Sequence, residues 1–248
     1  MSTAGRPRRW RPWVLAACVL AGGTNSAHRI AVTHAPGCAA YRPELNHHLV
    51  AHAGGGLPNR MYPNSIAALD HSYANGFRVF EMDFHQLPFG IMRAGHDPLD
   101  LLDPREAWLS QVLTWLRRHP DTRLFIDMKT DNVRGLTLIA AEAPDLRQRL
   151  TPFVYSRSQY SAVRAIGLSL PIYALFHNDD ADWLTFANSH DFAGVALPPE
   201  LISQLSKVRH PVIVYTYDTI RDAYADADTV ITNCMIPMDT RSGEAPKP

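Results

Sequence analysis

Two acidic residues two positions apart, followed by a histidine–aspartate pair, form the most reactive stretch of the chain. Glu81 and Asp83 lie in the apolar run Arg78–Phe84, and His96-Asp97 begins 13 positions after Asp83. If this run is a β-strand, its period of two places both carboxylates on one face and the apolar residues on the other. Paired carboxylates that face a protein interior need a cation or a shared proton. The stretch therefore predicts a divalent metal site with an imidazole nearby.

The composition is typical of one globular domain. The chain has 248 residues, of which 46% are hydrophobic and 19% charged, so it can bury a full core. Its 24 basic and 24 acidic residues balance, and the net charge gives no indication of a nucleic-acid-binding surface. The sequence contains no Gly-rich phosphate loop, no Cys-x-x-Cys pair and no internal repeat, which argues against a nucleotide-binding protein or a zinc ribbon.

The first residues have the pattern of an export signal. Four arginines within the first eleven residues precede the apolar run Trp13–Ala21, which is too short to span a bilayer. We interpret residues 1–27 as a signal peptide or N-terminal export segment, with a lipoprotein anchor at Cys18 as the alternative. The protein is then expected to be exported, periplasmic or secreted. In an oxidising compartment Cys38 and Cys234 are candidates for a disulfide.

From His48 onward, short apolar runs alternate with helical stretches, as in repeated βα units with a parallel sheet. The strands expected are His48–Ala51, Arg78–Phe84, Leu124–Met128, Phe153–Ser156, Ile172–Leu175, Gly194–Leu197, Val212–Thr216 and Thr229–Thr232. The helices expected are Asn64–Asn75, Arg105–Arg118, Arg134–Leu150, Gln159–Ile166, Asp179–Ser189, Pro199–Val208 and Ile220–Ala225. Eight alternating units predict an α/β fold, a (β/α)8 TIM barrel at 48–234, with a lead-in at 28–47 and a flexible tail at 235–248.

Reactive groups of such a barrel lie at the carboxyl ends of its strands. His119, His190 and His210 precede their strands and are expected at the opposite end. Carboxylates are the ligands that Mg²⁺ and Ca²⁺ prefer, and two histidines that titrate near neutrality suit proton transfer to and from phosphodiester oxygens. The candidates expected at one mouth are His52, Glu81, Asp83, His96, Asp97, Asp127 and Lys129.

These residues resemble the signatures of glycerophosphodiester phosphodiesterases. His52-Ala-Gly, Glu81-Met-Asp83 and His96-Asp97 stand for the family's His-Arg-Gly, Glu-x-Asp and His-Asp, with the family's usual interval of 13 between the last two. The likeness spans roughly residues 48–234. Further matches are Tyr62-Pro-Asn64-Ser65 for Pro-Glu-Asn-Thr, Ile126-Asp127-Met-Lys129 for the third carboxylate and lysine, and Val214-Tyr215-Thr216 for Val-Trp-Thr.

The resemblance implies a catalytic barrel of the PLC-like phosphodiesterase type. It implies a metal-dependent hydrolase of lipid metabolism that acts on glycerophosphodiesters or related phospholipid-derived phosphodiesters, with a small-molecule or lipid substrate and no nucleic acid. Peripheral membrane contact and the oligomeric state stay open. The implied roles are His52 and His96 as acid–base pair, Glu81, Asp83 and Asp127 as ligands of Mg²⁺ or Ca²⁺, and Lys129, Tyr215 and Asn64 as substrate-binding residues.

Two departures from the family pattern leave the substrate and its alcohol open. Ala53 replaces the arginine that contacts phosphate in the family, and Pro63 displaces the glutamate of Pro-Glu-Asn-Thr. The Asp127-x-Lys129 form is also similar to sphingomyelinase D-type enzymes, so a lipid phosphodiesterase or lyase is one alternative. A catalytically silent binding barrel is another. His85 alternates with Phe84 and is a second candidate for substrate contact.

Overall fold

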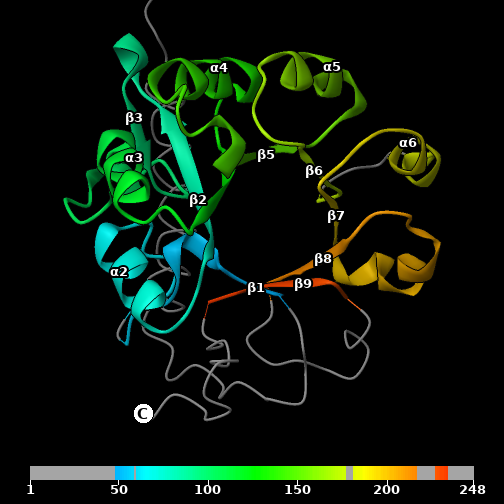
Figure 1. The fold of residues 1–248 in the computed structure, drawn as a ribbon, viewed down its shortest axis with the longest axis horizontal. Helices are drawn as coiled ribbons and strands as arrows, with labels where there is room; N and C mark the ends of the chain where they lie inside the picture. The colour runs from blue at the N-terminus through cyan, green and yellow to red at the C-terminus, as the bar shows by residue number, and fades with distance from the viewer. Residues whose placement is uncertain (1–47, 59, 177–180, 217–226, 234–248) are drawn as a thin grey trace, which may run out of the picture.

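In the computed structural model, the residues described are 48–58, 60–176, 181–216 and 227–233. They form a closed ring of parallel strands with helices outside it (Figure 1). The strand order is β1-β9-β8-β7-β6-β5-β4-β2, and pairing of β1 with β2 closes the ring. The predicted (β/α)8 barrel is therefore confirmed. Its strands are β1 His48–Ala51, β2 Val79–Gln86, β4 Arg123–Met128, β5 Leu150–Val154, β6 Ile172–Ala174, β7 Gly194–Leu197, β8 Val212–Tyr215 and β9 Thr229–Thr232.

Several sequence predictions fall on segments outside the described residues. They are the export segment at 1–27 with Cys18, the lead-in at 28–47 with Cys38, the helix at 220–225, and the tail with Cys234. These interpretations stay predictions. No helix in the described part of the chain combines the length and apolar character that a membrane span requires.

Helices connect the strands, and their first turns explain where they begin. The helix expected from Asn64 begins two residues later, because Ser65 is extended and its hydroxyl accepts a hydrogen bond from the Ala68 N–H at 3.3 Å. The elements are α2 Ile66–Ala74, α3 Leu109–Arg118, α4 Asn132–Glu142, α5 Arg157–Ala165, α6 Trp183–Ser189 and the 3₁₀ helix η5 Pro199–Lys207.

The boundary between α4 and β5 was predicted wrongly. The helix expected to reach Leu150 ends at Glu142, and β5 starts at Leu150 rather than Phe153. Pro144 follows the helix end, and proline cannot donate the backbone hydrogen bond that would continue the helix. The apolar residues after it belong to a buried strand, which periodicity alone does not separate from a buried helical face.

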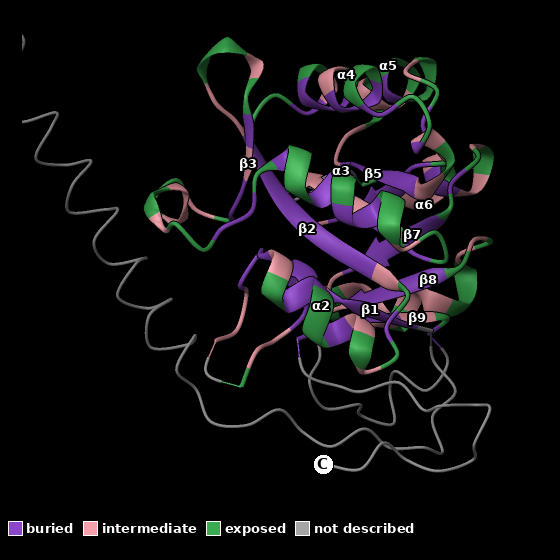
Figure 2. Cartoon of the chain, turned by 60° about the vertical axis from the view of Figure 1, so that its left-hand side comes forward, coloured by how far each residue is buried: buried purple, intermediate pink, exposed green. Residues whose placement is uncertain are grey.

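A short antiparallel strand, β3 (Met92–Ala94), pairs with the end of β2. The turn between them contains the 3₁₀ helix η2 (Pro88–Gly90), in which Phe89 and Gly90 have φ of 64° and 78°. Figure 2 shows this hairpin extending away from the barrel, with its tip exposed. The return along β3 leads directly to the loop that contains His96.

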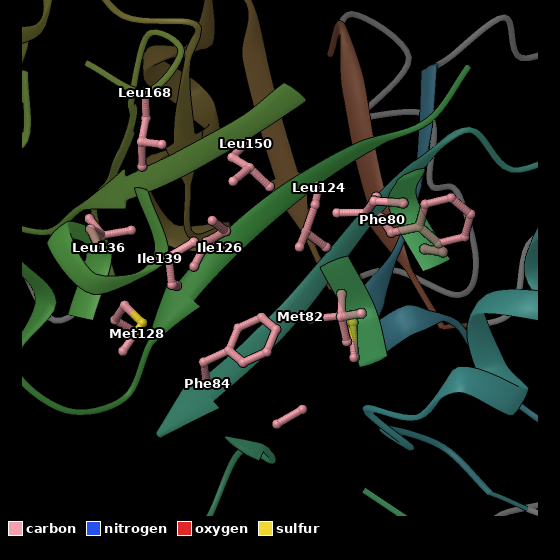
Figure 3. Close-up of a cluster of buried hydrophobic side chains, with 14 of the residues drawn as sticks. Phe80, Met82, Phe84, Leu124, Ile126, Met128, Leu136, Ile139, Leu150 and Leu168 are labelled. Carbon is pink, nitrogen blue, oxygen red and sulfur yellow. The ribbon is translucent and has the colours of Figure 1, made fainter. Parts of the chain in front are cut away.

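The core has two layers separated by the strands. On β2, Phe80, Met82 and Phe84 are fully buried and pack outward, with residues of β4 and α4, in the layer between the strands and the helices (Figure 3). The alternation predicted for β2 is therefore present, and it leaves Glu81 and Asp83 on the inner face. The layer inside the barrel consists of Val50, Phe153, Ile172, Ala174, Ala196, Ile213 and Ile231.

Candidate functional site

Strands β2 and β4 bring the three predicted acids together at the mouth of the barrel. In their parallel register Asp83 lies directly beside Asp127, and Glu81 precedes Asp83 by two residues on the same face. The three carboxylates offer oxygen atoms that all lie within 4.8 Å of one another. Glu81 and Asp83 are only 3% and 1% exposed. Three carboxylates so close together away from water require compensating positive charge or protons.

Lys129, just beyond the end of β4, supplies one positive charge. Its Nζ lies 2.8 Å from Asp83 Oδ1 and 2.6 Å from Asp127 Oδ2. Burial alone would lower the pKa of Lys129, but the carboxylates of Asp83 and Asp127 raise it above its ordinary value. Burial would likewise raise the pKa of Asp83, but Lys129 lowers it. Burial, with the charges of Asp83 and Asp127, raises the pKa of Glu81 well above its ordinary value, because a third negative charge at this point is costly without a cation.

The carboxylates fit a divalent cation, because a neutral donor holds one oxygen of each, and Lys129 supplies a single positive charge to the other oxygens of Asp83 and Asp127. The second oxygen of Asp83, Oδ1, is buried and has no hydrogen-bond partner among the described residues, although it lies near Nζ of Lys129. Such an arrangement offers hard oxygen ligands of the kind that Mg²⁺ and Ca²⁺ prefer. The bonds that hold the carboxylates run from Ala53 N–H to Glu81 Oε2 at 2.9 Å, from Asn64 Nδ2–H to Asp83 Oδ2 at 2.8 Å, and from the Tyr155 hydroxyl to Asp127 Oδ1 at 2.5 Å.

His52 follows β1 and lies beside the acids. Its Nδ1 is 2.8 Å from Asn233 Oδ1, and its Nε2 is 3.7 Å from Glu81 Oε2. Donation from Nδ1–H to the Asn233 oxygen leaves the lone pair on Nε2. The side chain is 12% exposed, and burial lowers the pKa of His52 against the opposing effect of Asp83. Burial therefore favours the neutral imidazole of His52, which can accept a proton at Nε2.

The backbone at His52 is shaped by a left-handed turn. Ala53 has φ of 52°, and its N–H points to Glu81. Gly55 has φ of 102°, and a Cβ there would lie 1.8 Å from the hydroxyl oxygen of Ser72 on α2. Only glycine lets this turn pack so closely against α2.

His96 occupies a more open position on the loop after β3. Its side chain is 42% exposed, and its Nδ1 lies 3.2 Å from Asp97 Oδ1. Asp100 holds this loop, because its Oδ2 accepts the backbone N–H groups of His96 at 3.0 Å and Asp97 at 2.8 Å. His85 points to the same face of β2 as the acids, and its Nε2 lies 3.0 Å from the His96 carbonyl oxygen. The structure thus gives His85 a supporting position beneath the His96 loop.

One cavity of about 660 Å³ connects these groups. Its wall has two different sides, which we call the carboxylate half and the aromatic half. The carboxylate half consists of His52, Glu81, Asp83, His96, Asp127 and Lys129, and the aromatic half of Phe153, Tyr155, Phe176 and Tyr215.

The structure brings almost all of the predicted site residues to this cavity, including Tyr215. Asp97 and Asn64 are the exceptions, and Asp97 contacts His96 instead of lining the cavity. Asn64 is fully buried, donates from Nδ2 to Asp83, and accepts the Asp83 N–H on its Oδ1 at 3.0 Å. Both ends of its amide therefore support the carboxylate, and it does not line the cavity that a substrate would occupy.

Residues to which the sequence assigned no role complete the site. Tyr155 holds Asp127, Asn233 orients His52, and the Tyr62 ring packs edge-on against His52 with centroids 5.0 Å apart. Tyr155 lies two positions after the inward-facing Phe153, and Asn233 follows the last strand. Two general rules could have identified Tyr155 and Asn233 from the sequence. Alternate residues of a strand face the barrel interior, and functional side chains lie at the carboxyl ends of the strands. Tyr62 belongs to the stretch Tyr62-Pro-Asn64-Ser65, but that likeness assigns its ring no role.

Solved structures of glycerophosphodiester phosphodiesterases have the same fold. One from Parabacteroides distasonis has a TM-score of 0.61 and 16% identity, with 76% of this chain and 93% of that one covered. One from Thermotoga maritima has a TM-score of 0.59 and 14% identity, with 76% and 95% covered. A phosphodiesterase from Oleispira antarctica, solved with the product sn-glycerol-3-phosphate, has a TM-score of 0.57 and 17% identity, with 79% and 96% covered. No family model and no curated protein matches this sequence.

Proposed function

We propose that this chain is a metal-dependent phosphodiester hydrolase that acts on glycerophosphodiesters or related phospholipid-derived phosphodiesters. The observation that carries the proposal is the placement of three carboxylates, a lysine and two histidines around one cavity at the carboxyl ends of the strands. The phosphodiesterase activity of the solved proteins with the same fold supports this reaction class, and the sn-glycerol-3-phosphate bound to one of them supports a glycerol phosphate moiety in the substrate.

Glu81, Asp83 and Asp127 would hold the cation. When bound, a divalent cation supplies positive charge that polarises a phosphoryl oxygen. Lys129 already lies beside two of these carboxylates, so its ammonium group would neutralise part of the phosphate charge from the same side. This role is important here, because Ala53 replaces the arginine expected for phosphate and contributes only its backbone N–H, to Glu81.

His52 and His96 would carry the protons. His52 removes the proton from the attacking hydroxyl at Nε2, while Nδ1–H stays bonded to Asn233. His96, which contacts Asp97, donates a proton to the oxygen that leaves phosphorus. One proton is taken and one is given, so the pair serves both steps of a phosphodiester cleavage. The N-terminal segment 1–27 supports export as part of the same proposal.

Hydrolysis followed by phosphorus NMR tests the proposal. The chain is incubated with glycerophosphoglycerol and with bis(p-nitrophenyl) phosphate, each with Mg²⁺, with Ca²⁺ or with a chelator. We expect a phosphate monoester to accumulate with at least one of the two metals and not with the chelator. The spectra also separate a cyclic phosphate that persists, as a lyase would give, from an open monoester. Absence of any turnover with both metals would contradict the proposed activity.

A further inference from the structure

Phe176 and Tyr215 of the aromatic half lie across the barrel from the carboxylate half, whereas Phe153 and Tyr155 lie beside β4, on and just after β5. In the closed ring, β1 is four strands away from β6, and β4 is four strands away from β8. Figure 1 shows β6 and β7 on the far side of the barrel from β2. His52 follows β1 and Asp127 lies in β4, whereas Phe176 follows β6 and Tyr215 ends β8. A molecule bound at the carboxylates therefore faces aromatic rings on its other side.

The aromatic half is a continuous apolar wall. The rings of Phe176 and Tyr215 have centroids 3.5 Å apart, and Phe153 stacks below Tyr155 with centroids 6.2 Å apart. Ala174 and Ile231 complete the apolar lining between them. Among the described residues of this wall, no side chain is charged.

The polar side-chain groups of this wall are few. The Tyr155 hydroxyl already donates to Asp127, which leaves the hydroxyl groups of Tyr215 and of the neighbouring Thr216. A polyol placed here would bury hydroxyl groups with few partners, and each unpaired hydroxyl costs binding free energy. An alkyl or aryl group would instead gain from leaving water, because binding removes apolar surface from solvent.

From this arrangement we infer that the enzyme prefers phosphodiesters in which one ester group is apolar, either an alkyl chain or an aryl ring, bound against Phe176 and Tyr215. The inference rests on the proposed function, since the phosphate is taken to lie at the carboxylate half. The cavity of about 660 Å³ is large enough for such a group beside the phosphate, because pockets for drug-sized ligands have volumes of roughly 300–1,000 Å³. An alkyl chain and an aryl ring both present apolar surface to this wall, and the substrate series below distinguishes them.

A series of substrates with one common half tests the preference. All contain glycerol 3-phosphate, and the second alcohol is glycerol, choline, hexanol or benzyl alcohol. Benzyl alcohol is used instead of a phenol so that the acidity of the leaving alcohol stays close to that of the alkyl compounds. We expect kcat/KM to be highest for the hexyl or benzyl ester, with a gain of about fourfold for each methylene that becomes buried.

Substitution of Phe176 connects this preference to the wall. Phe176→Ala should reduce the ratio of hexyl to glycerol turnover by at least about tenfold, since a large apolar contact is removed. Phe176→Leu, which keeps apolar volume, should restore most of the ratio. Phe89→Ala is the matched control, because Phe89 is 99% exposed at the hairpin tip and outside the cavity.

Binding without turnover separates this inference from the proposed function. Calorimetry with Mg²⁺ compares hexyl phosphate, benzyl phosphate and glycerol 3-phosphate on the parent chain and on Phe176→Ala. Tighter binding of the apolar phosphates that is lost in the variant supports the inference even if no diester is hydrolysed, in which case the proposed activity fails alone. Turnover with equal rates for all esters, or a preference unchanged by Phe176→Ala, overturns the inference and leaves the activity standing. A preference for choline over hexanol that depends on Phe176 also overturns it.

Discussion

The two halves of the cavity are built on the same barrel by the same strand alternation, yet they are held together by different forces. In the carboxylate half, each acid has an oxygen fixed by a directional hydrogen bond from Ala53, Asn64 or Tyr155. In the aromatic half, the contacts are between rings such as Phe176 and Tyr215. Loss of one partner of a buried hydrogen bond or ion pair leaves the other partner unsatisfied, which costs much free energy at once. Loss of an apolar contact costs free energy in proportion to the apolar area that is exposed. Substitutions should therefore act as all-or-none changes on one side and as graded changes on the other.

The largest effect is expected from Asp83→Asn. This change removes one negative charge between Lys129 and the other two acids, and with it a ligand of the proposed cation. We expect Mg²⁺ or Ca²⁺ affinity to fall strongly and turnover to drop by about 10³-fold, the upper end of the range for loss of a single electrostatic group. Calorimetry and turnover measure the two effects.

Asp145→Asn is the control for that change. Asp145 is exposed and pairs with Arg117 on the outer surface, so its loss should alter neither metal binding nor turnover. If Asp83→Asn binds both metals as tightly as the parent chain, the ligand set is assigned wrongly.

The next largest effect is expected from the histidines. His52→Ala and His96→Ala should each lower turnover by about 10²- to 10⁴-fold with metal binding largely intact. Turnover of the double variant should be only slightly lower than that of the less active single variant, because the two groups act as a unit. His71→Ala, an exposed histidine on α2, is the control.

The pH profile tests the same pair. Activity requires neutral His52, and burial lowers its pKa below the ordinary value of 6.5. The parent rate should then decline on the acid side only below pH 6.5, and the whole profile should be bell-shaped. Near-parental turnover of His96→Ala with a poor leaving group would refute the pairing. It would move the search to His85, which lies next to the His96 backbone.

A moderate effect is expected from Tyr155→Phe, because Tyr155 belongs to the aromatic half but bonds to the carboxylate half. Loss of its hydroxyl releases one oxygen of Asp127 while the ring stays in place. We expect metal affinity to fall by about tenfold, within the range for groups that orient metal ligands. The preference for apolar esters should persist. Tyr160→Phe, whose hydroxyl contacts the Asp191 backbone outside the cavity, is the control, and equal metal affinity in both variants would show that Tyr155 acts by packing alone.

The smallest effect on turnover is expected from Glu106→Gln. Glu106 is a buried glutamate like Glu81, but it lies outside the cavity. Burial raises the pKa of Glu106 to about 8 in spite of its contact with Arg60. The folded state therefore binds this proton more tightly than the unfolded chain. The resulting stabilisation is complete below pH 4.5 and is lost as the pH rises through about 8.

Glu106→Gln cannot ionise, so its unfolding free energy should decline less than that of the parent chain between about pH 5 and 9. Urea unfolding at several pH values measures this, with the exposed Glu142→Gln as control. Identical pH dependence in the parent chain and Glu106→Gln would mean that Glu106 is already ionised in its pair with Arg60. Turnover should stay within about twofold, because Glu106 does not line the cavity.

The sequence by itself determined the pattern of the barrel and the chemistry of its carboxylate half. Alternation over Arg78–Phe84 placed Glu81 and Asp83 on one face, and the eight apolar runs predicted strands that all exist. Both results depend on local periodicity. Residues i and i+2 of a strand lie on the same face whatever the strand pairs with, so this pattern can be read from one segment. The same local reasoning failed at the α4–β5 boundary, where a buried strand and a buried helical face have similar apolar runs.

Only the tertiary structure decided which groups hold these residues in place. The bond between His52 and Asn233 joins positions 181 residues apart, and it exists because closure of the ring makes β1 and β9 neighbours. Tyr155 reaches Asp127 across 28 residues, and Asn64 lies under Asp83 and away from the cavity. Phe176 and Tyr215 face the acids across the barrel for the same reason. Which strands oppose each other in a closed ring depends on the number of strands and their order, and no single segment of sequence carries that information.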